Sequence, residues 1–127
     1  MELLKLYINI LGMNELISHD CTVRMILFNG RCEGKYFNGT ILPGGVDTQL
    51  IREGASGTLS ARYMLEGYDS EGQLCHIYIE NNADHGSPDT CPILHTDSPA
   101  LKWLETETLA GRIENPDGQL VITIYRK

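Results

Sequence analysis

Apolar and polar side chains alternate with a period of two along most of this chain, and this alternation constrains its fold more than any other feature. Between Leu59 and Leu65 every second residue is apolar, and Leu120, Ile122 and Ile124 repeat the pattern near the C-terminus. Successive side chains of a β-strand point to opposite faces, so a period of two predicts strands. The chain is therefore expected to be all-β.

Turn-forming dipeptides separate these runs at intervals of about ten residues, as in a series of β-hairpins. They include Asn29-Gly30, Asn38-Gly39, Pro43-Gly44-Gly45, Glu53-Gly54, Glu71-Gly72 and Asp117-Gly118. The predicted strands are residues 4–11, 21–28, 31–35, 38–42, 46–53, 57–67, 73–82, 107–114 and 119–126.

Eight or nine consecutive antiparallel strands must pair or protect their edges, and closure into a barrel does this most simply. A barrel of about eight strands has room for packed side chains or for one small ligand. We therefore predict a single-domain antiparallel β-barrel over residues 1–127, with a two-sheet sandwich as the alternative.

Residues 83–100 interrupt the pattern with a polar stretch that contains Pro88 and Pro92. The stretch is long for a hairpin connection, so we expect one long mobile loop, either a lid over the barrel mouth or a surface excursion. After it, residues 98–105 are expected to form a helical turn, with Ser98 as cap and Pro99 at the first helical position, or the start of a strand.

The formal net charge of −7 argues against partners that are nucleic acids or anionic membranes. The N-terminal segment carries Glu2 and Lys5 and lacks the features of a signal peptide, which favours a cytoplasmic protein. In that compartment the four cysteines are expected to be reduced thiols. The terminal strands, 4–11 and 119–126, are apolar on two faces, which suggests a homodimer or small homo-oligomer.

Three central motifs and one C-terminal motif carry a resemblance to a known family. They are Gly39-Thr-x-Leu-Pro-Gly-Gly-x-Asp-x-Gln49, Leu59-x-Ala-Arg-Tyr-x-Leu65 and Ile77-Tyr-Ile-x-Asn81, followed by Thr96-x-x-Pro-Ala-x-x-Trp-Leu104. Over about residues 20–127 the chain resembles the DUF3237 family, also called UPF0311. The resemblance implies a calycin-like antiparallel barrel with a pocket, and it implies no particular activity because the family is mostly uncharacterised.

Two positions depart from the pattern expected of that family. Thr48 stands where an aromatic residue, commonly Trp, is expected, and Asn82-Ala83 replaces what is usually Arg-Gly. If the aromatic residue forms a wall of the family pocket, the pocket of this chain is more open and more polar.

Asp47 and Gln49 share one face of their predicted strand, and Arg62 lies on the next strand of the same hairpin. Together they would form a polar patch inside the barrel that orients a small oxygen-rich ligand. Asp47 would then be the catalytic acid or base of any reaction, with Arg62 holding an anionic group. The alternative is that Arg62 and Asp47 form an ion pair or cap the corner at Gly44-Gly45. Arg62 could equally face outward, because it alternates with Leu59, Ala61 and Tyr63.

Asn81, His76 and Tyr78 are the further candidate ligand-binding residues, all on the strand that leads into the proline-containing stretch. The four histidines show no metal-ligand spacing, so neither a metal nor another cofactor is expected.

Three functions fit these observations. The first is a small-molecule-binding β-barrel. The second is a cofactor-independent lyase, isomerase or cyclase that uses Asp47, and the third is a structural or assembly module without a ligand.

Overall fold

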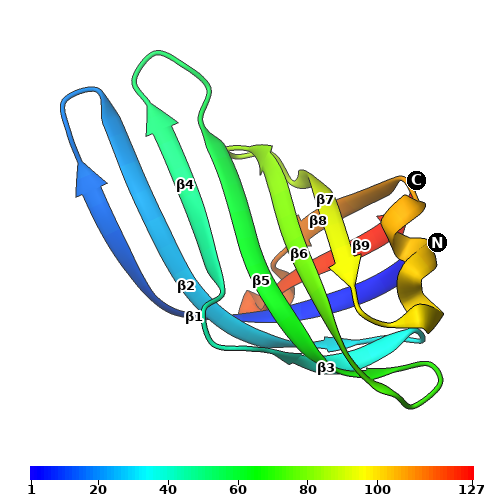
Figure 1. The fold of residues 1–127 in the computed structure, drawn as a ribbon. Coiled ribbons are helices and arrows are strands. Elements are labelled where there is room, and N and C mark those ends of the chain that lie inside the picture. The colour runs from blue at the N-terminus through cyan, green and yellow to red at the C-terminus, as the bar shows by residue number, and fades with distance from the viewer.

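A computed structural model describes residues 1–127 and contains nine antiparallel β-strands and two short 3-10 helices (Figure 1). The strands are β1 (Glu2–Ile17), β2 (Cys21–Glu33), β3 (Phe37–Ile41), β4 (Val46–Arg52), β5 (Thr58–Asp69), β6 (Leu74–Asp84), β7 (Asp89–Thr96), β8 (Leu109–Glu114) and β9 (Leu120–Arg126). The helices are η1 (Pro99–Thr106) and η2 (Pro116–Gly118).

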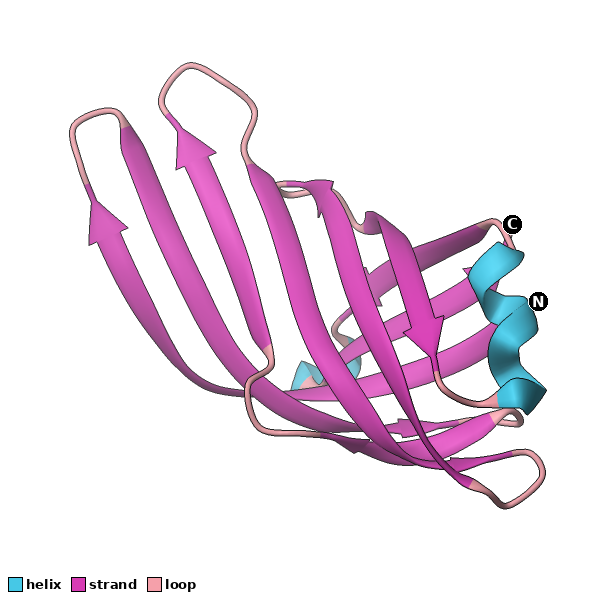
Figure 2. Ribbon diagram, in the orientation of Figure 1, coloured by secondary structure: helices cyan, strands magenta, loops and turns pink.

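The strands close into a barrel because β1 pairs on one side with β2 and on the other with β9. Eight strands form the closed antiparallel barrel and one is additional, so the all-β barrel prediction is confirmed. Figure 2 shows how little helix the fold contains, with η1 placed beside the two chain termini. Neither η1 nor η2 has the length and hydrophobicity that a membrane-spanning helix needs.

β3 and β4 lie one after the other between β2 and β5, because each of them pairs with both of these strands. Together they fill one strand position in the barrel wall. The Pro43-Gly44-Gly45 corner separates them. Gly44 has a φ of +113°, a region that side chains with a Cβ rarely adopt. At Gly45 a Cβ would lie 2.9 Å from the carbonyl oxygen of Phe28, so the corner packs closely on β2.

The two parts of this wall differ in what lies behind them. Beside β3, Leu65 pairs with Ile41 and Ile77 in register, and all three side chains are buried in the main core of 19 residues. Leu101 and Leu104 of η1 belong to the same core. Beside β4 the register brings Asp47 opposite Ala61 and Ala61 opposite Asn81, so the packed apolar interior gives way to polar and small residues.

Three expectations about the elements need correction. Residues 21–28 and 31–35 form one continuous strand, β2, and β1 is longer than predicted. The expected long loop at 83–100 is wrong, because residues 89–96 form β7 and only a short turn remains after Asp84. β7 pairs with β8 only at Asp89 and Thr90, so beyond Thr90 this side of β7 is a free edge. Pro92 is tolerated there because no neighbouring strand requires a backbone N–H from it.

The expected helical turn at 98–105 is present as η1, with Pro99 at its start. Ser98 does not cap it: the hydroxyl of Ser98 donates instead to Oδ2 of Asp69, at 2.7 Å.

Candidate functional site

A cavity of about 210 Å³ lies inside the barrel on the side of β4. Its walls are mostly apolar and come from β1, β2, β4, β5, β6, β8 and β9. The lining residues are Ile8, Ile10, Ile26, Phe28, Asp47, Gln49, Leu59, Ala61, Asn81, Ile113, Leu120 and Ile122. Three of the twelve are polar, and all three were predicted from the sequence to face the interior.

Asp47 and Gln49 enter this cavity because they follow the corner at Gly45 on alternate positions of β4. The Gln49 amide Nε2 donates to Oδ2 of Asp47 at 3.0 Å. The other carboxylate oxygen, Oδ1, is buried without any hydrogen-bond partner. Burial raises the pKa of Asp47, while the hydrogen bond from Gln49 and the charge of His85 act in the opposite direction.

Asn81 lies in the same row of the wall, two strands away, and only 1% of its surface is exposed. Its Oδ1 atom also has no partner. Neighbouring strands are about 4.8 Å apart, so the backbones of Asp47 and Asn81 are separated by about 10 Å. The side chain between them is the methyl group of Ala61, which leaves space for a group that contacts both.

Two more buried hydroxyl groups lack partners in this structure. The Oη atom of Tyr63 is buried, and the Tyr63 ring packs edge-to-face on Phe28 with 5.3 Å between centroids. Thr90 Oγ1 on β7 is the other. Buried polar atoms are normally satisfied, and each exception costs about 1–3 kcal/mol. The barrel interior therefore offers unused hydrogen-bonding capacity within apolar walls.

Arg62, His76 and Tyr78 do not lie in this cavity. The expected inward position of His76 and Tyr78 is wrong, and of the two positions left open for Arg62 the structure has the outward one. All three side chains point outward, because the residues next to them in β5 and β6 point inward. Arg62 forms an ion pair with Glu80, with 3.4 Å between Nε and Oε1, and 62% of its side chain is exposed. The period-two phase that places Ala61 and Tyr63 inside places Arg62 outside.

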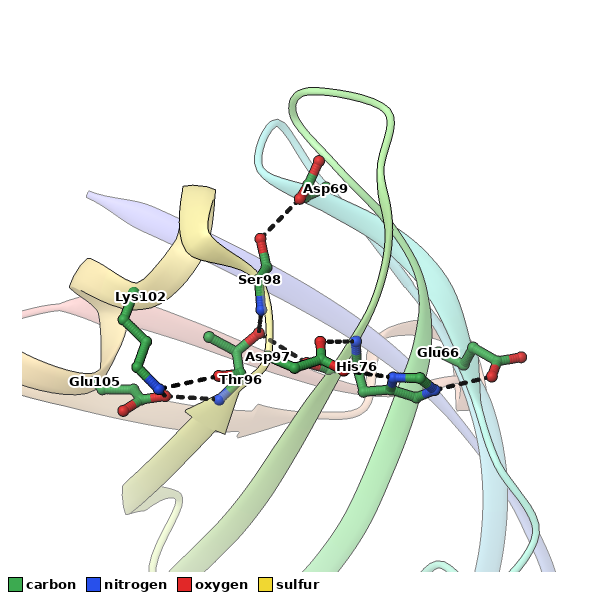
Figure 3. Close-up of polar contacts among 8 residues, drawn as sticks. All are labelled: Glu66, Asp69, His76, Thr96, Asp97, Ser98, Lys102 and Glu105. Carbon is green, nitrogen blue, oxygen red and sulfur yellow. Dashed lines mark hydrogen bonds and ion pairs between the residues drawn. The ribbon is translucent and has the colours of Figure 1, made fainter.

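His76 stands at the centre of a polar cluster on the outer face (Figure 3). Its Nδ1 lies 2.8 Å from Oδ2 of Asp97 and its Nε2 lies 3.0 Å from Oε2 of Glu66. These hydrogen bonds, first that of Asp97 and then that of Glu66, raise the pKa of His76. The backbone N–H of His76 donates to Asp97 as well, which lowers the pKa of that carboxyl.

An open hollow of about 550 Å³ lies beside this cluster and is larger than the interior cavity. Its polar groups already bind one another: Lys102 Nζ lies 2.9 Å from Oε2 of Glu105, and that oxygen also accepts from the backbone N–H of Thr96 at 2.8 Å. Tyr78 donates to Glu80 at the hollow's rim. Because the outer groups are satisfied and exposed, the interior cavity is the stronger candidate site.

No group of three or more His, Cys, Asp or Glu side chains is arranged to hold a metal ion. All four cysteines are free.

The sequence did not reveal most of the apolar lining, such as Ile8, Phe28 and Ile113, or the carboxylates around His76. The lining residues come from strands far apart in the chain. Where both faces of a strand are apolar, the local sequence does not predict which face lines a cavity. For His76 a signal existed, because Glu66 is its register partner across the β5–β6 hairpin.

Comparison with known proteins agrees with this architecture. Residues 14–90 match the model of DUF3237, a protein family of unknown function. A UPF0311 protein of Clostridium acetobutylicum, CA_C3321, is 30% identical over 115 residues, covering 75% of this chain and 69% of that protein. The chain belongs to the DUF3237 family, as the sequence motifs predicted.

Solved structures show the same fold. A protein of unknown function from Clostridium acetobutylicum is similar with a TM-score of 0.78 at 26% identity, over 99% of this chain and 94% of that chain. A β-barrel-like protein from Acinetobacter baumannii has a TM-score of 0.78 at 22% identity, over 98% and 92% of the two chains. An enzyme from Penicillium herquei has a TM-score of 0.75 at 18% identity, over 98% and 92%. The last two likenesses show the fold alone.

Proposed function

We propose that this protein binds a small, largely apolar molecule with one hydrogen-bond donor inside its barrel. The observation that carries the proposal is the pair of unpartnered acceptor oxygens, Oδ1 of Asp47 and Oδ1 of Asn81, on the wall of an otherwise apolar cavity. A hydroxyl or N–H group held over Ala61 would satisfy one or both oxygens. Few polar groups placed in an apolar cavity are typical of small-molecule sites.

The size of the cavity limits the ligand. At 210 Å³ it is smaller than the roughly 300–1,000 Å³ of pockets for drug-sized molecules, so the ligand is compact. A single-ring alcohol or phenol has the required shape and polarity. Such a ligand would remove apolar surface from water and would donate one hydrogen bond to an oxygen that has no other partner.

Phenol and its methyl ether, anisole, test this proposal because they differ in the donor group. Phenol should raise the melting temperature of the protein in a concentration-dependent way, as any ligand that binds only the folded state must, and anisole should raise it less. In Asp47→Leu the preference for phenol should disappear. Asp97→Leu, which removes an exposed carboxylate from the outer face, is the matched control and should keep it.

Equal stabilisation by phenol and anisole in the wild type would show that the two oxygens do not select a donor. No stabilisation by either compound at millimolar concentration would favour a barrel that has a structural role without a ligand.

A cofactor-independent enzyme is the second candidate, and the raised pKa of Asp47 favours it. A carboxyl group whose pKa is raised by burial is suited to proton transfer nearer neutral pH, as in general acid–base catalysis. The reaction would be an isomerisation, elimination or cyclisation of the bound molecule. Mass spectrometry should then detect conversion of a ligand co-purified with the protein, and Asp47→Asn should stop conversion while the ligand still binds.

A cytoplasmic location belongs to the same proposal. It is supported by the cysteines, none of which is paired with another in a disulfide. Four free cysteines are usual in a reducing compartment.

A further inference from the structure

The far ends of β1 and β2 extend beyond the part of the barrel that β7, β8 and β9 close (Figure 1). We call residues 9–27, which comprise these strand ends and their turn, the distal arm. β1 pairs with β9 only from Glu2 to Ile8, whereas its pairing with β2 continues to Ile17. One edge of β1 therefore has no neighbouring strand from residue 9 onward.

This edge differs from the other incomplete edge in the barrel. β7 lacks a neighbour beyond Thr90, but η1 lies against it and Glu105 accepts the N–H of Thr96. The only helix that packs extensively against a strand is η1 on β7, so the distal arm has no comparable cover. Unpaired strand edges are templates for pairing with another chain unless charges, proline or a covering element protect them.

The arm also concentrates the apolar surface of the molecule. Seven of the twelve exposed large hydrophobic residues lie on it: Ile10, Leu11, Met13, Leu16, Ile17, Met25 and Leu27. About half of each side chain is exposed, and because neighbouring residues of a strand point to opposite faces, this apolar surface lies on both faces of the arm beside its free edge. Two adjacent charges on the arm, Glu15 and Arg24, form an ion pair and neutralise each other.

We propose that the distal arm is the dimer interface, in which residues 12–17 of β1 pair antiparallel with the same residues of a second copy. Two-fold symmetry brings the same edge of each subunit together, and antiparallel strands meet this condition directly. The β-bulge between Ile10 and Gly12 marks where this pairing would begin.

The second copy would also cover one side of the interior cavity. Ile10 lines the cavity although 56% of its surface is exposed, so the wall of the cavity is open beside it. A partner strand along β1 would cover this opening with its own apolar residues.

The test compares two double variants of equal charge change. Leu16→Lys with Ile17→Lys places charges on the arm, and Tyr68→Lys with Leu74→Lys places them on residues of similar exposure at the hairpin between β5 and β6. Light scattering across the micromolar range should give twice the 14.2 kDa chain mass for the wild type and for the control, and the chain mass for the arm variant.

Hydrogen exchange on the wild type provides a measurement that does not depend on the variants. The amides of residues 12–17 that point away from β2 should be protected at concentrations that favour the dimer and should lose protection on dilution, while those bonded to β2 stay protected. A wild type that is monomeric throughout, or an arm variant that dimerises as the wild type does, would overturn the proposal. Binding of a monomeric wild type to anionic phospholipid vesicles, lost in the arm variant, would overturn it in favour of a membrane surface.

Discussion

Polar side chains lie on both faces of the β4–β5–β6 wall, but those on the outer face are hydrogen-bonded and exposed, whereas those on the inner face are buried and include oxygens that lack partners. On the outer face, His76 is bonded through both ring nitrogens to carboxylates that remain in contact with water. On the inner face, Asp47 has one bond from Gln49 and one buried oxygen without a partner, and Asn81 is almost completely buried with the same deficit.

Buried polar groups without partners are stronger indications of function than satisfied polar groups on the surface. A polar group on the surface can be satisfied by water or by a neighbour and contributes little either way. A buried, unsatisfied group lowers the stability of the fold, so its presence requires another explanation, such as a bound molecule. The smaller cavity is for this reason the more informative of the two hollows.

The largest expected effect is on the free energy of unfolding, and it should differ between an inward-facing and an outward-facing residue of the same strand. Leu65→Ala on β5 removes a completely buried side chain and should lower the free energy of unfolding by about 2–5 kcal/mol. Met64→Ala, the outward-facing neighbour, should change it by about 0.5 kcal/mol or less. Chemical denaturation measures both, and similar losses would show that the inward and outward assignments of β5 are wrong.

Replacing aspartate by asparagine should change the free energy of unfolding in opposite directions at Asp47 and Asp97. At neutral pH, Asp47→Asn should raise the free energy of unfolding by up to about 1 kcal/mol, because burial disfavours the charged carboxylate. Asp97→Asn should lower it by less than about 1 kcal/mol, because His76 favours the charged form of an exposed carboxylate.

The pH dependence provides the control for this pair. A folded-state pKa above the unfolded value means that Asp47 adds stability as pH falls through that raised pKa, whereas the lowered pKa of Asp97 means that its contribution is lost on acidification. Changes of the same sign in the two variants would contradict the comparison of the two faces.

Tyr63→Phe should have a smaller effect, a gain of about 0.5–1 kcal/mol in the free energy of unfolding, because it removes a buried hydroxyl group that has no partner. Thermal denaturation without ligand measures it. A clear loss of stability would indicate that the hydroxyl is bonded in solution, for example to a buried water molecule.

The smallest expected effect concerns the outer cluster. The pKa of His76 is raised above 6.5 by Asp97 and Glu66, so the stabilising contribution of the charged imidazole is complete below pH 6.5 and is lost as pH rises through the folded-state pKa. An NMR titration of the His76 ring should show this raised value, and Asp97→Asn should bring it closer to 6.5. A His76 pKa below 6.5 would be inconsistent with the charged cluster.

Much of this architecture was accessible from the sequence because strand periodicity and turn residues are local signals. Asp47 and Gln49 were placed correctly because the corner at Gly44-Gly45 fixes the start of β4 and alternation fixes the rest. The position of Arg62 stayed open because the estimated hairpin register put it near Gln49 while the alternation of β5 put it outside; the structure pairs it with Val46 and points it outward. Strand β7 was missed because Pro92 argues against a strand, and only the incomplete pairing with β8 shows why it is tolerated there.

The pairing of β1 with β9 has a consequence for how the molecule folds. It joins residues 2–8 with residues 120–125, at opposite ends of the chain, while most other pairings link strands that are near in sequence. Bringing distant segments together has an entropic cost that grows with the length of chain between them, and folds dominated by such contacts fold slowly, in milliseconds to seconds. We expect the hairpins to form early and the seam between β1 and β9 to close last, so a nascent chain cannot complete its barrel until its final strand has left the ribosome.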